Sequence, residues 1–466
     1  KIEGITEAVV ATFLLYIATA IPEASMILAC SNMLEVATLS ELVASLKDFS
    51  ISAKAMQNAQ LRDLTQFFEL QVLVNRIAAT VDWDAERRHR VDPELVNIPP
   101  EEVYKRARKI FTYGKSAGYR YTRMSMGDYV ASRWEGVPTG SVHSQYEDDQ
   151  VYIVKNVKHR SKFVTLNMMP KEYIKHMMSR TPQIRAWCSV KYEWAKVRGI
   201  YGTDLTSTVI TNFAMYGCEG VFKHRFPVGR DAEASRVHKR LKHLLVDAES
   251  YCYDYVDFNS QHSVPTMYAV LAAYRDEFDA DMTPEQKAAM QWVCESILDV
   301  RVKQPSGEWY RALGTLMSGW RLTSFMNTAL NYIYMDYAGV FTTADITDSV
   351  HNGDDALLAV HSLRSALTAE RKMQKIGARA QPDKCNIFST GEFLRVEHKR
   401  DVGDGNGAQY LSRGCATAVH SRIESMEPTS VLQASTAVVN RMGELAARAG
   451  RVSKTIRLLT DTQLNN

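Results

Sequence analysis

The sequence contains little of what marks a disordered or fibrous protein. Only 13 of its 466 residues are proline and 24 are glycine, and it has no low-complexity tract and no repeat of fixed period. With 45% hydrophobic and 23% charged residues, the composition is that of a folded globular protein. Because a chain of this length exceeds the usual size of one hydrophobic core, we expect two or three packed units.

Cysteine motifs and membrane-spanning runs are also missing. The seven cysteines include no Cys-x-x-Cys pair, which argues against a zinc or dithiol site and indicates a reducing, cytosolic compartment. The longest apolar run, residues 9–21, contains Thr12 and Thr19 and is shorter than the roughly 20 residues of a transmembrane helix. We therefore expect no membrane partner. Because Lys1 is not a methionine and no signal-peptide pattern follows it, we expect that the chain was trimmed from a longer protein.

Charge is distributed unevenly along the chain. The net charge is +3, but residues 151–200 carry +9 and residues 221–245 carry +5, which leaves −11 for the remainder. Concentrated basic segments beside an acidic remainder are typical of a protein that binds a polyanion at one place. Solvated basic helices would give the same count, so charge alone leaves both interpretations open.

Hydrophobic periodicity predicts helices at both ends of the chain and a mixed middle. The capping box Thr283-Pro284-Glu285-Gln286 and Pro100 mark two helix starts, and residues 113–149, rich in Gly, Ser and Tyr, predict loops. The expected helices are 9–21, 61–74, 101–111, one starting near 171, 284–298 and 429–459, and the strand-like runs are 151–154, 163–166 and 251–256.

A pair of adjacent carboxylates stands at a predicted hairpin. Asn352 and Gly353 form a turn signal that leads into Asp354, Asp355 and the apolar run 356–360. Adjacent aspartates repel each other, and a bound cation relieves that repulsion. The alternative is a solvated turn, since a Gly-Asp-Asp triplet alone is a weak signal.

A further carboxylate, Asp254, comes near the end of the aromatic and β-branched run 251–256. If Asp254 lies beside the hairpin, three carboxylates meet. That number of hard oxygen ligands suits two Mg²⁺ ions that also bind a triphosphate, whereas Zn²⁺ would need histidine and cysteine clusters. The alternative is that Asp254 caps a helix.

A polar stripe runs along a predicted apolar helix. Thr323, Asn327 and Asn331 recur at every fourth position, which places them on one helical face. Such a stripe needs hydrogen-bonding partners, either a buried network or a bound nucleotide. Ser318 and Gly319 precede it and predict a flexible loop at the start of the helix.

Basic residues flank these elements on both sides. Lys196 and Arg198 alternate at strand spacing, so two cations share one face, where they can hold a triphosphate or protect an edge strand. Lys384 is a single lysine after the turn signal at Pro382.

In chain order, these elements resemble the motif series of viral RNA-dependent RNA polymerases. Lys196-x-Arg198 is similar to motif F, Asp254 with Asn259 to motif A, and Ser318-Gly319 with Thr323 and Asn327 to motif B. Further on, Gly353-Asp354-Asp355 is similar to motif C, Lys384 to motif D and Glu392-Phe393-Leu394-Arg395 to motif E. The run 257–262 and the helix after Ser318 look closest to totivirus-like polymerases of double-stranded RNA viruses. The resemblance covers about residues 185–400.

The resemblance implies an α+β right hand of fingers, palm and thumb. We expect residues 1–120 to form an N-terminal helical region that packs on fingers and thumb, and 121–250 to form fingers with the basic elements. We expect 251–400 to form the palm, an antiparallel sheet flanked by helices, with 265–312 returning to the fingers. Residues 401–466 would form a helical thumb.

The resemblance also implies roles for single residues. Asp254 and Asp354, assisted by Asp355, would hold two Mg²⁺ ions, for which Mn²⁺ is a possible substitute. Lys384 would act as a general acid toward pyrophosphate. The expected nucleotide-binding residues are Lys196, Arg198, Asn259, Ser318, Gly319, Thr323 and Asn327. Asn259 stands where many plus-strand virus polymerases have aspartate, and Asp257 competes with Asp254 for the motif A position.

The expected activity is addition of ribonucleotides to an RNA 3′-hydroxyl, directed by an RNA template, for viral replication and transcription. The expected partners are template and product RNA, nucleoside triphosphates and a viral capsid protein, either as a separate chain or fused upstream. The expected location is the virion interior and the host cytoplasm. The alternatives are a reverse transcriptase, against which Gly353 and the polar stripe argue, and a non-enzymatic RNA-packaging protein, for which the basic segments would suffice.

Overall fold

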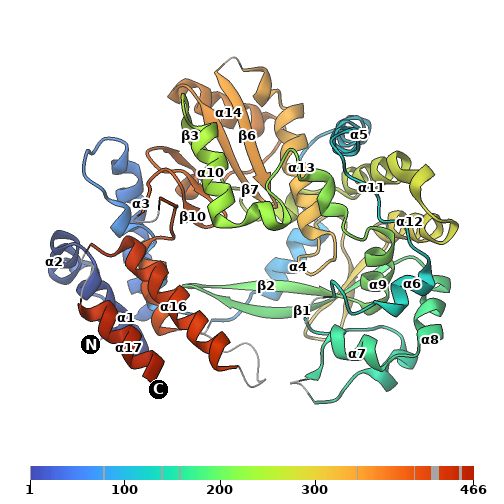
Figure 1. Cartoon of the computed structure of the whole chain (residues 1–466), viewed down its shortest axis with the longest axis horizontal. Helices are drawn as coiled ribbons and strands as arrows, with labels where there is room; N and C mark the ends of the chain where they lie inside the picture. The colour runs from blue at the N-terminus through green and yellow to red at the C-terminus, as the bar shows by residue number, and fades with distance from the viewer. Residues whose placement is uncertain are drawn as a thin grey trace.

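The computed structural model describes residues 2–465 except 77–78, 138–139, 157–158, 344, 403–404, 421–429 and 451–453. This part of the chain combines helices with two four-stranded sheets and a two-stranded hairpin (Figure 1), which confirms the predicted α+β class. Among the described helices, none is both long and apolar enough to cross a bilayer.

Helices dominate the first 180 residues and the C-terminal end. Before the first strand lie α1 (Glu7–Thr19), α2 (Pro22–Cys30), α3 (Leu39–Gln57), α4 (Trp83–Val91), α5 (Pro100–Ser116), α6 (Met126–Ala131), α7 (Lys162–Met168) and α8 (Lys171–His176). The middle of the chain contains α9 (Leu205–Ala214), α10 (Ala234–Leu244), α11 (Val264–Phe278), α12 (Pro284–Ser296), α13 (Thr323–Tyr337) and α14 (Leu363–Lys375). After the last strand come α15 (Leu411–Val419), α16 (Val431–Arg448) and α17 (Lys454–Asn465).

The first sheet has the strand order β2-β1-β4-β5. Its long hairpin pairs β1 (Ile184–Glu193) with β2 (Lys196–Thr203), and the short strands β4 (Val300–Lys303) and β5 (Trp309–Arg311) extend the other edge. β1 and β4 run parallel, whereas the other two pairs are antiparallel.

The second sheet is entirely antiparallel, with the order β6-β7-β3-β8. Its strands are β3 (Glu249–Tyr253), β6 (Ile346–Asn352), β7 (Asp355–Val360) and β8 (Asn386–Phe388). The central strands β3 and β7 are buried along nearly their whole length because apolar residues fill both faces. Tyr251 and Leu358 pack into the largest core, while Cys252 and Leu357 pack with Val237 of α10.

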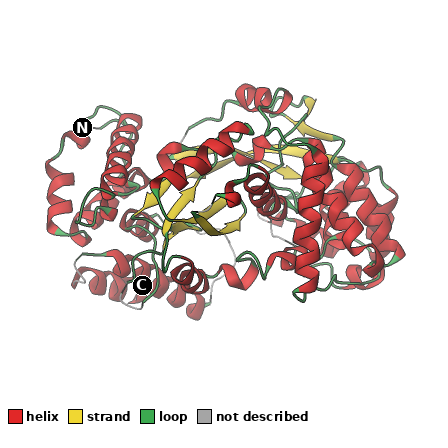
Figure 2. Cartoon of the chain, turned by 90° about the horizontal axis from the view of Figure 1, so that it is seen from above, coloured by secondary structure: helices red, strands yellow, loops and turns green. Residues whose placement is uncertain are grey.

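The two ends of the chain share a separate hydrophobic core. Phe13 and Tyr16 of α1 pack in one buried cluster with Cys415 of α15 and Leu445 of α16. Figures 1 and 2 accordingly show the N-terminal and C-terminal helices side by side, away from the middle of the molecule. A small hairpin of β9 (Glu392–Phe393) and β10 (Val396–Glu397) lies between this core and the second sheet.

Most of the predicted helices are confirmed. α1, α5, α8 and α12 cover the expected segments, and Thr283 and Gln286 form the predicted reciprocal capping box. The C-terminal helix is confirmed as two helices, α16 and α17, and Thr429 lies outside the described residues.

Four local predictions are wrong. Residues 163–166 lie in α7, because the Ser161 hydroxyl accepts the Val164 N–H and starts a helix there. The run 151–154 begins within a 3₁₀ turn, Glu147–Tyr152, and forms no strand. The segment 61–74 folds into short 3₁₀ turns, interrupted by the left-handed Glu69 with φ 58°. The region 113–149, predicted as loops, contains the end of α5 and the helix α6.

Candidate active site

The second sheet places Asp254 beside the Gly-Asp-Asp hairpin. Asp254 directly follows β3, which pairs with β7 in the register Tyr253 to Ala356. Because Asp355 directly precedes Ala356, the two carboxylates lie at the same end of adjacent antiparallel strands. Figure 1 shows β3, β7 and β6 next to one another at this place. Asp254 therefore ends a strand and does not cap a helix.

The predicted hairpin is confirmed, with its turn one residue further along than expected. Asn352 ends β6 and pairs with Asp355, so Gly353 and Asp354 are the two turn residues. Gly353 adopts φ +60°, a left-handed conformation that favours glycine at this position. Asp354 is exposed at the tip.

Helix α13 holds this turn in position. The Thr328 hydroxyl accepts the Gly353 N–H at 2.8 Å. The Asn331 amide donates to the carbonyl groups of Gly353 and Asp355, both at 3.1 Å. Asn331 thus belongs to a buried hydrogen-bond network, which is the first of the two alternatives that the sequence left open for the polar stripe.

Negative charge is crowded at this end of the sheet. Burial, followed by the charges of Asp354, Glu392 and Asp254, raises the pKa of Asp355 to about 7. Burial also raises the pKa of Asp254. The charge of Lys384 opposes this shift, and the charges of Asp354 and Glu392 add to it. Each carboxylate thus makes ionisation of the other less favourable, and a bound cation would relieve that repulsion.

The donor set fits a hard divalent cation in its chemistry. Asp254, Asp354 and Asp355 offer carboxylate oxygens, the ligands that Mg²⁺ and Mn²⁺ prefer. As the side chains stand, no three acidic, histidine or cysteine residues of the described chain are arranged to hold an ion. The backbone brings the three aspartate residues together, and their side chains must turn toward a shared point to bind a metal.

Lys384 lies in this carboxylate cluster. Its Nζ is 3.1 Å from Asp254 Oδ1. The turn that carries it is fixed to the end of β3, because the Gln381 N–H donates to the Asp254 carbonyl at 2.8 Å. The structure thus brings Asp254 and Lys384, the residues that resemble motifs A and D, into direct contact.

Asn259 and Asn327 also meet. Asn327 Nδ2 donates to Asn259 Oδ1 at 2.8 Å, and Asn327 Oδ1 lies 2.9 Å from His262 Nε2. Burial lowers the pKa of His262 to about 4, so the ring is neutral at pH 7 and its Nε2–H donates to Asn327. Tyr334 then donates to His262 Nδ1 at 2.9 Å. Among the described residues, Asn259 Nδ2 has no hydrogen-bond partner, so it remains available to a ligand.

Thr323 is used differently. Its hydroxyl lies 2.8 Å from the carbonyl oxygens of Met317 and Trp320 and closes the turn before α13. It makes no hydrogen bond to Asn259 or Asn327. Asn327 and Asn331 therefore bond to the loops around the carboxylates, whereas Thr323 bonds only to the turn that starts α13.

The loop at Ser318 and Gly319 is attached to β2, contrary to the flexible loop that the sequence predicts. Gly319 N donates to the Tyr201 carbonyl at 2.9 Å, and the Ser318 hydroxyl accepts the Tyr201 N–H at 3.0 Å. A Cβ atom on Gly319 would lie 2.4 Å from the Tyr201 oxygen, so only glycine allows this approach. The loop therefore links the first sheet to α13.

Lys196 and Arg198 lie near the tip of the first sheet and share one counter-ion. Lys196 Nζ is 3.3 Å and Arg198 Nε is 3.2 Å from the Glu193 carboxylate, and about half of each basic side chain is exposed. Burial, then the charges of Arg198 and Lys384, lower the pKa of Lys196. Lys384 therefore lies close enough to Lys196 for its charge to disfavour the protonated form of Lys196.

Asp257 stands apart from the cluster. It adopts the left-handed φ of 40° and its carbonyl accepts the Ser260 N–H at 2.9 Å. Its side chain is exposed and forms no hydrogen bond or ion pair with any described residue. The geometry therefore favours Asp254 as the motif A carboxylate.

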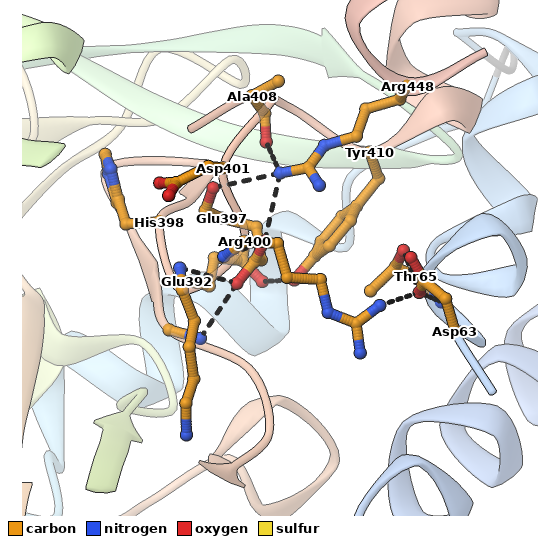
Figure 3. Close-up of polar contacts among 12 residues, drawn as sticks. Asp63, Thr65, Glu392, Glu397, His398, Arg400, Asp401, Ala408, Tyr410 and Arg448 are labelled. Atoms are coloured by element: carbon orange, nitrogen blue, oxygen red, sulfur yellow. Dashed lines mark hydrogen bonds and ion pairs between the residues drawn. The ribbon is translucent and has the colours of Figure 1, made fainter. Parts of the chain in front are cut away.

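The motif E hairpin connects the cluster to both ends of the chain. Tyr410 donates to Glu392 at 3.0 Å, and Arg448 of α16 lies 3.0 Å from the fully buried Glu397 carboxylate. Arg400 forms an ion pair with Asp63 on the N-terminal side. Figure 3 shows these contacts around Glu392, Glu397 and Arg400.

Three residues of this site were missed in the sequence. Thr328 positions the hairpin turn, His262 orients Asn327, and Glu193 pairs with the two basic residues. Glu193 carries a usable signal, since it is the one acidic residue between Lys191 and Arg198. Thr328 and His262 carry none, because their partners lie more than 20 residues away along the chain.

Comparisons with known proteins agree with the motif series. The family model described as viral RNA-directed RNA-polymerase matches residues 1–423. The probable RNA-directed RNA polymerase of Saccharomyces cerevisiae virus L-A is 51% identical over 445 residues, 95% of this chain and 30% of the relative. The corresponding protein of Saccharomyces cerevisiae virus L-BC is 37% identical over 412 residues, 87% of this chain and 27% of the relative.

A more distant relative is the probable RNA-directed RNA polymerase of Helminthosporium victoriae virus-190S, 25% identical over 399 residues. This chain spans less than a third of the length of the L-A and L-BC proteins. The matches confirm the resemblance to polymerases of totivirus-like viruses. The chain belongs to the viral RNA-directed RNA polymerase family.

Proposed function

We propose that this chain adds ribonucleoside triphosphates to an RNA 3′-hydroxyl under the direction of an RNA template. The observation that carries the proposal is the position of Asp254 beside the Asp354-Asp355 hairpin, with Lys384 in contact with Asp254. Family membership supports the same activity, which would serve viral replication and transcription.

In this proposal, Asp254 and Asp354, assisted by Asp355, hold two Mg²⁺ ions, for which Mn²⁺ can substitute. When bound, the ions supply activation of the 3′-hydroxyl and neutralisation of the triphosphate. Lys384 leaves its ion pair with Asp254 and binds the leaving pyrophosphate. It then donates a proton from Nζ to a pyrophosphate oxygen. The raised pKa values of Asp254 and Asp355 support a cation at this place.

The remaining site residues bind the nucleotide. Lys196 and Arg198 exchange the Glu193 carboxylate for phosphate oxygens, since exposed ion pairs are weak and easily replaced. Asn259 and Asn327 present amide groups to the ribose. Ser318 and Gly319 hold the start of α13 against β2.

We assign the elements to a right hand. The palm is 251–400, with the segment 265–312 returning to the fingers of residues 121–250. The thumb is 401–466, and the helical region 1–120 packs on fingers and thumb. In support, α15 and α16 share a core with α1.

We also propose that a viral capsid protein is a partner, as an upstream fusion or a separate chain, in the virion interior and host cytoplasm. The greater length of the relatives is consistent with a fusion. The alternatives, a reverse transcriptase or an RNA-packaging protein, are less supported. A reverse transcriptase would use the arrangement of Asp254, Lys384 and the hairpin, whereas an RNA-packaging protein would give it no role.

A primer-extension assay tests the function. The chain is incubated with a primed RNA template, labelled ribonucleoside triphosphates and Mg²⁺. We expect products whose length follows the template and which disappear when the metal is chelated. Preference for deoxynucleotides would favour the reverse transcriptase, and RNA binding without extension would favour the packaging protein.

A further inference from the structure

A cavity lies on the first sheet and is formed by residues other than those of the candidate active site. It has a volume of about 500 Å³, the size range of small-ligand sites. One wall is the sheet and the other is the loop 144–150. None of the candidate active-site residues lines it.

Strand register places aromatic and basic side chains on one face of this sheet. Trp187 on β1 pairs with Lys303 on β4, and Lys303 pairs with Trp309 on β5. A second row lies two residues away on each strand. In it, Arg185 of β1 pairs with Arg301 of β4, and Arg301 pairs with Arg311 of β5. Because directly paired residues and residues two apart share a face, the six side chains form two neighbouring rows across three strands.

The two tryptophans form an aromatic corner. Their rings are 5.3 Å apart at an interplanar angle of 78°, and Trp309 is 40% exposed. His143 stacks on Trp187 at 5.1 Å and 10°, an approach that Gly202 permits by lacking a side chain. The Trp187 ring is thus fixed on one side. A flat aromatic ligand can stack on one tryptophan with its edge against the other.

Positive charge surrounds the corner and is only partly neutralised. Lys303 Nζ lies 5.8 Å from the centre of the Trp309 ring. Arg185 and Arg301 share a single acid, Asp299, at 2.7 and 3.2 Å. Glu147 is the acidic residue among those lining the cavity. With three basic residues, one lining acid and one shared acid, the surface retains a net positive charge suited to a phosphate.

The loop wall offers an unsatisfied amide. Gln145 lines the cavity, and both its side-chain nitrogen and oxygen are buried without a hydrogen-bond partner among the described residues. A buried amide lacking both partners is costly, and a ligand with a donor and an acceptor on one edge would satisfy it. The edge of a nucleobase has that pattern.

We propose that this cavity binds one nucleotide of a single-stranded RNA. The base stacks at the Trp187–Trp309 corner with its edge toward Gln145, and the phosphate contacts Arg301 and Lys303. A row of arginines, Arg185, Arg301 and Arg311, crosses three β-strands and extends further than one phosphate requires. Such a row fits an RNA strand with repeated phosphates better than a free nucleotide. The site is independent of the proposed catalytic residues.

Photo-cross-linking tests this site directly. A short single-stranded RNA with one 4-thiouridine is irradiated with the full chain, and the labelled peptides are identified by mass spectrometry. We expect label in the peptides that carry Trp187 and Trp309. Label confined to other segments would overturn the proposal. The Asp354→Asn variant should be labelled equally, so failure of the catalytic assignment and failure of this site remain distinguishable.

Variants measure the contribution of the corner. Trp309→Ala should reduce cross-linking at this site by about 5- to 100-fold, the usual range for loss of one base-stacking partner. The matched control is Trp134→Ala, which removes a tryptophan of similar exposure, 41%, on another element. Equal labelling of both variants would overturn the proposal. If Trp309→Ala unfolds by circular dichroism, Lys303→Glu takes its place with the same expected loss.

Two competitors identify the ligand. Unlabelled single-stranded RNA should suppress the label at far lower nucleotide concentration than ATP does, because a strand contacts more than one arginine. Fully paired RNA should compete poorly, since its bases are not free to stack. If ATP competes as well as the strand, the cavity binds a free nucleotide and the proposal of an RNA site is wrong.

Discussion

Lys384 Nζ lies 3.1 Å from Asp254 Oδ1, with 45% and 34% of the two side chains exposed. Partly exposed ion pairs of this kind contribute about 0–1 kcal/mol, so exchange of partners costs little free energy. Asp254 can therefore release the ammonium group for a metal ion, and Lys384 can then bind a phosphate.

Replacement of Asp254 should distinguish it from Asp257. We expect Asp254→Asn to lower the rate of nucleotide addition at least about a hundredfold, because it removes one of the proposed metal ligands. Asp257→Asn should retain most activity, since the Asp257 carboxylate is exposed and forms no hydrogen bond or ion pair with a described residue. Steady-state primer extension gives both values. A larger loss for Asp257→Asn would exchange the two assignments.

Removal of Lys196 or Arg198 should weaken binding of the incoming nucleotide. Loss of a charge-assisted hydrogen bond to phosphate predicts a rise in KM for nucleoside triphosphates of about tenfold. Lys287→Ala, which removes an exposed lysine paired with Asp279 on another surface, is the matched control. If RNA affinity falls while KM stays constant, Lys196 and Arg198 bind the template instead.

The Asn259–Asn327 pair should set the preference for ribonucleotides. Either alanine variant removes an amide from the network, and we expect the ratio of kcat/KM for ribo- over deoxyribonucleotides to fall about tenfold. Thr323→Val is the control, because its hydroxyl bonds to loop carbonyl groups and should affect both substrates equally. Equal losses for both substrates in Asn259→Ala would make the network purely structural.

The ion pair between Arg448 and Glu397 should stabilise the C-terminal part of the fold. Glu397 is fully buried, so Arg448→Ala leaves a carboxylate without its charged partner, at a cost of about 3–5 kcal/mol. Arg441→Ala on the same helix, where the side chain bonds to the Ala437 carbonyl, should cost far less. Urea unfolding of both variants measures the difference. Equal stabilities would show that the pair contributes nothing.

The sequence predicts best where a few adjacent residues decide the structure. The hairpin at Gly353 follows from local turn chemistry, and the helix after Thr283 follows from its capping box. The prediction for residues 163–166 is wrong because one capping hydroxyl, at Ser161, outweighs the strand propensity of the apolar residues after it.

Contacts between distant segments could not be predicted from spacing. The sequence places Asp254 near a strand end, but only the pairing of β3 with β7 sets it beside Asp355. The polar stripe is visible in the sequence, yet the different partners of Asn327, which bonds to Asn259, and of Asn331, which holds the hairpin turn, depend on groups brought in by other elements. His262 and Thr328 could be recognised only once their partners were in place.

Nucleotide addition by the Asp354→Asn variant tests the central claim most directly. The variant removes one carboxylate charge from an exposed turn residue, so the fold and RNA binding should persist. We expect primer extension to be abolished while affinity for the primed template stays within about twofold of the original. Retention of a tenth or more of the original extension rate, in a variant that binds RNA normally, would contradict the assignment of Asp354 to the catalytic site.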